Sequence, residues 1–421
     1  MQSSIKLRLT VMNFLQFAVW GAYLTSMGRY LGTAGFGSEI GNFYAMQGLV
    51  SLFMPALMGI VADRWIPAQR LLGLCHTLAG MLMLGVFLYT QTDAPSYPSL
   101  FALYSLSVAF YMPTLALSNS VAYTSLDQAG LDLVKSFPPI RVFGTVGFIC
   151  TMIAVSLLGL EATSGQFAVS AIISLVLAVY AQTLPNCPTA PKGQSKSLVE
   201  ALGLRAFVLF KQRKMALFFI FSMLLGVSLQ ITNGFANPFI STFGEIPAYA
   251  DTFGVKYANI LISLSQLSET LCILLIPFAL RRFGIRRVML IAMVAWVLRF
   301  ALLGLGNPGS GVWLFLLSMI VYGVAFDFFN VSGSLFVDKE TDPSIRSSAQ
   351  GLFMIMTNGI GATLGSLGAQ AVINRFVYSQ SEATAILSGW TTSWYIFAGY
   401  AAVVAVLFAL LFRYNTATGA K

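Results

Sequence analysis

The sequence MIVYGVAFDFFN, residues 319–330, places a carboxylate in the middle of an otherwise apolar run. An ionisable side chain at the centre of a membrane helix costs roughly 2.5–3.5 kcal/mol on insertion scales. We therefore expect Asp327 to have a use, with polar partners around an internal cavity. In a helix, Tyr322 and Phe326 share one face, while Asp327 and Asn330 occupy the neighbouring strip. The stretch predicts a binding wall and not a lipid-facing surface.

The composition of the whole chain is that of a multi-span helical membrane protein. Of its 421 residues, 57% are hydrophobic and only 9% are charged, whereas about a quarter of the residues in soluble domains are charged. Apolar runs of about 20 residues, long enough to cross a bilayer, alternate with short charged loops. The formal charge of +9 resides at the ends of these runs and not in an aromatic-interleaved patch. We therefore expect a lipid bilayer as partner and no nucleic acid.

The apolar runs predict an all-α membrane protein with twelve transmembrane helices. Among the 24 Lys and Arg residues, only Arg29, Lys256, Arg299 and Arg375 fall outside the segments that are cytoplasmic when the N-terminus is inside. This bias predicts that both termini are cytoplasmic. The first run lacks a cleavage site and is long enough to span, so we interpret it as a helix and not as a signal peptide. The expected spans are 9–28, 40–62, 71–90, 100–122, 141–160, 166–185, 215–236, 257–279, 287–305, 312–335, 348–372 and 391–412.

Internal similarity divides the spans into two six-helix halves, 1–185 and 215–421. The motif at 108–111 is echoed at 324–327, and the motif at 138–141 is echoed at 343–346. A parallel duplication of six helices is the pattern of the major facilitator fold, which binds its substrate at mid-membrane between the halves. The connection 186–214 is rich in Pro, Lys and Ser and is expected to be a cytoplasmic linker with a short amphipathic helix over 198–210.

A second signature of that superfamily follows the second span. The sequence GIVADR, residues 59–64, resembles the loop between helices 2 and 3 of major facilitator proteins, in which a glycine permits close helix approach. Asp63 and Arg64 are accordingly expected to act in gating, by pairing with neighbouring helices in one access state. The sequence departs from the general pattern in Trp65-Ile66-Pro67.

Polar residues inside the spans recur at helical spacing. Glu269 and Asp327 are the only two of the 15 acidic residues deep inside a predicted span. An isolated amide can hold helices together through an interhelical hydrogen bond worth about 0.6 kcal/mol, but that role needs no charged side chain. In hydrocarbon such strips must face inward. The four strips are Arg141, Thr145 and Phe148 on span 5, Gln230 and Asn233 on span 7, Gln266 and Glu269 on span 8, and Tyr322, Phe326 and Asp327 on span 10.

The sequence offers no metal or cofactor site. The four cysteines show no ligand spacing, and His76 is the only histidine. We interpret His76 as a helix-packing residue, and Arg299 as a side chain that snorkels or pairs within the fold.

The stretches FPPIRVFGTVGF (137–148), LQITN (229–233) and 322–330 carry a more specific resemblance. They resemble the bacterial nucleoside:proton symporters, the nucleoside permease and xanthosine permease group, and the similarity runs over nearly the whole chain. The resemblance implies uptake of a neutral nucleoside such as uridine or adenosine with protons, by alternating access, through a monomer in the cytoplasmic (inner) membrane. It implies substrate binding by Arg141, Thr145, Phe148, Gln230, Asn233, Gln266, Glu269, Tyr322 and Phe326, and proton coupling through Asp327 and Glu269.

The chemistry of these side chains suits a nucleoside, because aromatic rings can stack on a base and amides can match ribose hydroxyls. A proton-coupled sugar or oligosaccharide symporter would also mix carboxylates, amides and aromatics, and is the main alternative. An intramembrane aspartyl protease would need two aspartates where this chain pairs Asp with Glu, so we expect no enzyme. A nucleoside sensor that binds without transporting remains a further alternative.

Overall fold

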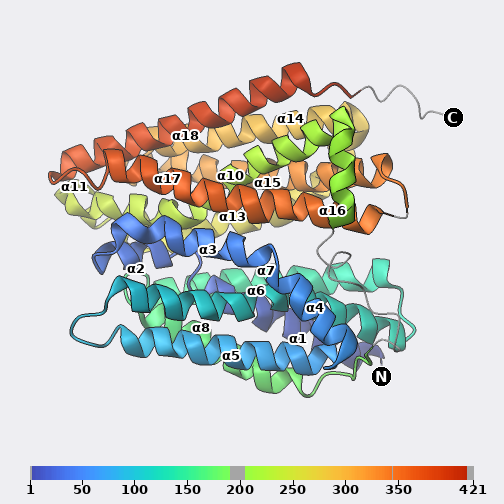
Figure 1. The fold of residues 1–421 in the computed structure, drawn as a ribbon. Coiled ribbons are helices and arrows are strands. Elements are labelled where there is room, and N and C mark those ends of the chain that lie inside the picture. Colours follow the sequence, from blue (N-terminus) through green and yellow to red (C-terminus); the bar gives the residue numbers. More distant parts are fainter. Residues whose placement is uncertain (1, 190–203, 344, 415–421) are drawn as a thin grey trace. The chain divides into compact units, whose positions relative to one another are not determined.

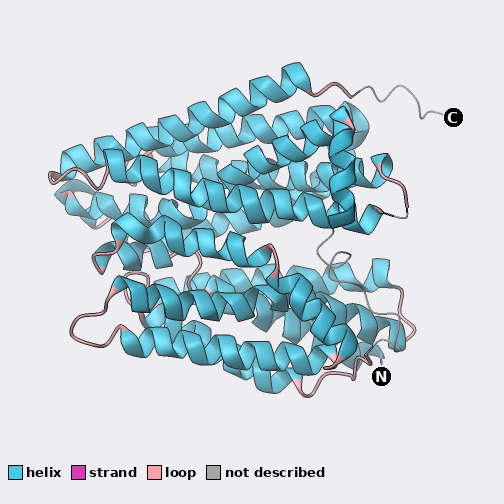
Figure 2. Cartoon of the chain, in the orientation of Figure 1, coloured by secondary structure: helices cyan, strands magenta, loops and turns pink. Residues whose placement is uncertain are grey.

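The computed structural model describes residues 2–189, 204–343 and 345–414, and all regular elements in these ranges are helices (Figure 2). Nine of the helical stretches in these ranges are long and apolar enough to cross a membrane. The prediction of an all-α membrane protein is confirmed at this level.

Contacts between Cα atoms divide the chain into two compact units. The first unit contains Met1–Phe36 and Met46–Leu202, and the second contains Gly37–Ala45 and Gly203–Lys421. Of the helix predicted over 198–210, residues 198–203 lie outside the described residues. The remainder, up to Phe210, falls within η2 (Leu204–Lys211), which is a 3-10 helix.

The helices of the first unit run roughly alongside one another (Figure 1). The α3 helix (Ile40–Ser51), which follows η1 (Gly37–Glu39), contributes residues to both units. The other elements of the first unit are α1 (Gln2–Gly21), α2 (Met27–Thr33), α4 (Met54–Arg64), α5 (Ala68–Tyr89), α6 (Tyr97–Gln128), α7 (Leu133–Leu157) and α8 (Gly165–Ala181).

Two predicted spans of the first unit are not continuous helices. Residues 22–26 form turns between α1 and α2, so the single helix predicted over 9–28 was wrong at its end. The predicted span 40–62 is divided at residues 52–53, directly before α4. Pro55 lies in the first turn of α4, where its missing N–H is tolerated, and its ring prevents the preceding helix from running on without a break.

Close contact between α1 and α7 decides where the α7 side chains point. A Cβ on Gly147 would overlap the backbone of Phe14, so only glycine allows the two helices to approach this closely. The α1 helix also packs against α8, and α5 packs against both α6 and α8. The core among these helices is apolar and includes Leu9, Leu72, Val121 and Leu126.

In the second unit, α15 packs against both α13 and α14, and α10 packs against α17 and α18. The backbone leaves the helical region at Gly284 (φ 74°), which lies between the predicted spans 257–279 and 287–305. The long helices are α10 (Arg213–Thr242), α13 (Ala258–Cys272), α14 (Ile276–Leu305), α15 (Val312–Glu340), α16 (Arg346–Met354), α17 (Ala362–Phe376) and α18 (Ala383–Leu411). The shorter elements are η3 (Phe243–Glu245), α11 (Pro247–Ala250), α12 (Phe253–Lys256), η4 (Ile273–Leu275) and the π-helical η5 (Ile355–Gly361).

Candidate functional site

The α7 strip in the first unit presents a cation, a hydroxyl and a ring in a row. Arg141 and Thr145 are partly exposed, while Phe148 is 6% exposed. The Arg141 guanidinium lies 4.1 Å from the centroid of the Phe17 ring on α1. A cation over an aromatic face is held by the ring quadrupole. The predicted residues of span 5 therefore form one group, and α1 orients its cation.

An aromatic residue that the sequence reasoning did not select joins this group. The Trp20 ring of α1 meets the Phe148 ring edge-on, with 6.3 Å between centroids, and lies 6.0 Å from the Tyr111 ring of α6. Its buried Nε1 has no hydrogen-bond partner among the residues that the structure describes. Trp20 follows Gln16 by four positions, so the polar strip on the first span was the signal that could have pointed to it.

Beneath these rings, the single histidine joins three helices. His76 is fully buried, its Nδ1 lies 2.9 Å from Ser174 Oγ, and its Nε2 lies 2.9 Å from Gln16 Oε1. The Gln16 amide donates to Thr114 Oγ1 (2.7 Å), and the Tyr111 hydroxyl donates to the Gln16 carbonyl (2.8 Å). Both ring nitrogens are occupied, so His76 packs helices together and positions Tyr111.

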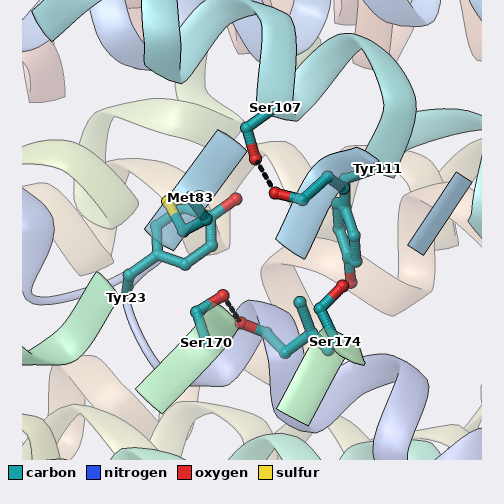
Figure 3. Close-up of a pocket in the computed structure, with 8 residues that line it drawn as sticks. Tyr23, Met83, Ser107, Tyr111, Ser170 and Ser174 are labelled. Atoms are coloured by element: carbon teal, nitrogen blue, oxygen red, sulfur yellow. Dashed lines mark hydrogen bonds between the residues drawn. The ribbon is translucent and has the colours of Figure 1, made fainter. Parts of the chain in front are cut away.

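Figure 3 shows a small pocket next to this network. Hydroxyl groups of Tyr23, Ser107 and Ser170 surround it together with apolar side chains such as Met83. Ser107 donates to the Ala79 carbonyl, and Ser170 donates to the Val19 carbonyl, each at 2.8 Å. None of the predicted binding residues lines this pocket. It is therefore a packing feature of the first unit and separate from the α7 strip.

In the second unit, α15 carries the aromatic pair and the buried acid. The Tyr322 and Phe326 rings stack with 5.6 Å between centroids and 11° between planes. Asp327 is 5% exposed, and its Oδ2 has no hydrogen-bond partner within the described ranges. Asn330, expected on the same wall, donates its amide to the Phe326 carbonyl (2.9 Å).

Close packing of α13 on α15 brings the second acid to this group. A Cβ on Gly323 would overlap the Ser268 carbonyl, so glycine is required where the two helices meet. Glu269 consequently lies within electrostatic reach of both Asp327 and Tyr322. One turn earlier on α13, the buried Oε1 of Gln266 lacks a hydrogen-bond partner in the part of the chain that the structure describes.

The α10 strip forms its own hydrogen bond. The Asn233 amide donates to Gln230 Oε1 at 2.8 Å, so the two side chains predicted to share a face do so. Gln230 is buried and Asn233 is partly exposed. The unused amide donors of Gln230 and the Asn233 carbonyl can serve a ligand that both donates and accepts.

The residues predicted for gating join neither of these groups. Asp63 is partly exposed and Arg64 is exposed at the end of α4, which has no buried residue. The close approach expected at Gly59 was wrong for this structure: within the described ranges, nothing lies within 4 Å of the position that a Cβ would take. The large side chain of Trp65, the residue directly after α4, is exposed. The described residues also contain no cluster of His, Cys, Asp and Glu able to hold a metal ion.

The whole chain matches one protein family. The sequence model of the nucleoside H+ symporters matches residues 3–417. The xanthosine permease of Escherichia coli (strain K12) is 50% identical over 415 residues, which cover 98% of this chain and 97% of that protein. The nucleoside permease NupG of the same organism is 47% identical with the same coverage.

Structural similarity agrees with the sequence matches. A crystal structure of the nucleoside transporter NupG superposes with a TM-score of 0.89 and 46% identity, and the match covers 98% of this chain and 100% of that one.

Proposed function

Because the chain belongs to the nucleoside H+ symporter family, we propose that it carries a neutral nucleoside into the bacterial cell together with a proton. The observation that carries this proposal is a pair of acids beside stacked aromatic rings: the buried Asp327 and the partly buried Glu269 with Tyr322 and Phe326. Rings recognise a base, and a carboxyl group in a low-dielectric site can take up and release a proton. The family is one of nucleoside symporters, so the sugar alternative is set aside.

The proposed architecture is that of the major facilitator fold, with twelve spans in the two halves 1–185 and 215–421 and the linker 186–214 between them. The charge bias of the loops supports cytoplasmic termini in the inner membrane. A monomer suffices for this proposal, because the residues of all four polar strips come from one chain.

Both units contribute to nucleoside recognition in this proposal. The first unit supplies Arg141, Thr145 and Phe148, and the second supplies Gln230, Asn233, Gln266, Glu269, Tyr322 and Phe326. Two of these groups have buried polar atoms that lack partners or are only partly used, Gln266 Oε1 and the Gln230–Asn233 pair. A buried polar atom without a partner costs about 1–3 kcal/mol. A bound nucleoside that supplies the missing hydrogen bonds removes that cost.

Proton coupling is assigned to Asp327, with Glu269 chiefly a ligand-binding group. Asp327 is the more buried of the two, and a proton on it removes one of two neighbouring negative charges. Each 100 mV of membrane potential supplies about 2.3 kcal/mol per proton carried, enough to concentrate a neutral solute tens-fold. Asp63 and Arg64 stay proposed gating residues, which would pair with neighbouring helices in one of the two access states.

The proposal is tested with the purified full-length chain in proteoliposomes. Radiolabelled uridine, adenosine and xanthosine are offered with and without a pH gradient, acid outside, and maltose and lactose are offered as competitors. We expect a pH gradient to drive accumulation of at least one nucleoside, and the disaccharides to have no effect. Binding of a nucleoside without accumulation would instead identify a sensor. Competition by a disaccharide would favour the alternative of a sugar or oligosaccharide symporter.

A further inference from the structure

Arg299 is a fully buried cation on α14 that the proposed nucleoside site does not use. It is 2% exposed, and its Nη1 donates to the Ser318 carbonyl at 2.8 Å and lies 3.4 Å from Ser265 Oγ. Among the described residues, no carboxylate lies within ion-pair distance of it, and its buried Nε has no hydrogen-bond partner. A cation kept in hydrocarbon without an ion pair calls for a function.

The geometry around Arg299 centres on Tyr322. The guanidinium carbon lies 4.5 Å from the centroid of the Tyr322 ring. From the same helix, Trp296 meets the Tyr322 ring edge-on, at 5.9 Å and 87°. Tyr322 in turn stacks on Phe326. The α14 helix thus contacts the first ring of the aromatic pair through two side chains, and the pair can shift only if these contacts break.

Three charged side chains lie within electrostatic reach of the same phenol. The Tyr322 hydroxyl interacts electrostatically with Arg299 from α14, Glu269 from α13 and Asp327 from its own helix. Cys272 of α13 also lies within electrostatic reach of Asp327. When both acids are ionised, Arg299, Glu269 and Asp327 together carry a net charge of −1. Binding of a single proton makes this set of side chains neutral.

We propose that Arg299 is a positioning residue with two effects: it holds Tyr322 against Phe326 for base stacking, and its charge sets the pH at which the Glu269–Asp327 pair takes up the transported proton. This inference rests on the proposed function and adds to it a residue that touches neither substrate nor proton. The two effects separate experimentally, because lysine keeps the charge and loses the planar guanidinium.

The experiment compares Arg299→Lys and Arg299→Gln in the full-length protein. Arg287→Gln is the matched control, because it removes the same charge from an exposed residue on the same helix. Uridine affinity is measured by calorimetry on purified protein at pH 5.5, and the pH profile of uptake is measured in proteoliposomes. Size-exclusion elution confirms that each variant is folded.

We expect Arg299→Lys to weaken uridine binding about five-fold or more through the lost ring contact, with an unchanged pH profile. Arg299→Gln should weaken binding similarly and also move the midpoint of the uptake profile upward. The shift should be on the order of one pH unit, because loss of a positive charge makes it easier for the carboxyl pair to take up a proton. Arg287→Gln should behave like the unmodified protein in both measurements.

The following results would contradict the proposal. Unchanged uridine affinity in Arg299→Lys overturns the positioning effect, and an unchanged pH profile in folded Arg299→Gln overturns the charge effect. If neither variant folds, Arg299 serves the fold and the inference is wrong. A failure of the unmodified protein to accumulate nucleosides on a pH gradient would refute the proposed function itself, which keeps the two failures distinguishable.

Discussion

The Asn233 amide donates to the Gln230 side-chain oxygen at 2.8 Å, one turn away on the same helix. This bond fixes the orientation of both amides, because Gln230 must present its oxygen to Asn233 and its amide donors elsewhere. The pair therefore offers one adjacent donor and acceptor set, which is the pattern that a ribose hydroxyl or a base edge can complement.

Replacing either member of this pair should weaken nucleoside binding. We expect Gln230→Ala and Asn233→Ala each to cost about 1–3 kcal/mol of binding free energy, since a buried ligand group loses its partner. Calorimetric titration with uridine measures the loss, and Gln380→Ala, in an exposed loop, is the control. Wild-type affinity in both variants would place the ligand elsewhere.

Substitution of Asp327 and of Glu269 should affect proton coupling and nucleoside binding differently. Asp327→Asn is expected to retain measurable nucleoside binding and to lose accumulation driven by a pH gradient, because the amide cannot carry the proton. Glu269→Gln should lose affinity first. Uptake and binding assays on the same preparations check both outcomes, with Asp93→Asn in an exposed loop as control. Accumulation by the Asp327→Asn protein would assign the proton to Glu269 or another group.

Nucleotides should be poor ligands. A 5′-monophosphate would have to shed its hydration near Glu269 and Asp327, where like charges repel it. We expect uridine or adenosine to displace bound radiolabelled nucleoside at concentrations at least 100-fold below the matching monophosphate. Equal competition by the nucleotide would mean that the phosphate stays in water or meets a cation, and the proposed orientation would have to be abandoned.

The contact between α13 and α15 should be intolerant of a single methyl group. Gly323→Ala places a Cβ against the Ser268 carbonyl and the Cys272 sulfur, so the helices must separate. We expect a loss of about 1–3 kcal/mol in stability and weaker nucleoside binding, because Glu269 moves away from Tyr322. Thermal unfolding in detergent is the measurement. Gly399→Ala, where nothing lies within 4 Å of a Cβ, should keep the original melting temperature.

The helical spacing of polar and aromatic residues, together with the hydropathy of the sequence, was sufficient to predict which side chains share a helix face. Tyr322 with Phe326, and Gln230 with Asn233, lie together as their spacing requires. The cross-helix contacts were not predictable in the same way. Arg299 lies over Tyr322 from a neighbouring helix, and Trp20 lies against Phe148 because glycines let α1 and α7 approach. A spacing rule within one helix contains no information on its neighbours. The break before α4 was readable in principle, since Pro55 marks it.

The full enclosure of His76 has a practical consequence for chemical modification. Diethyl pyrocarbonate acylates imidazole nitrogens that solvent can reach, and this ring has none exposed. The chain contains no second histidine. Treatment with this reagent is therefore expected to spare uptake, whereas a carboxyl-directed carbodiimide able to enter the membrane should abolish it. A response of transport to acidity between pH 5 and 8 then owes nothing to a solvent-exposed imidazole, which makes this protein a simple background for introducing a reporter imidazole at a chosen depth.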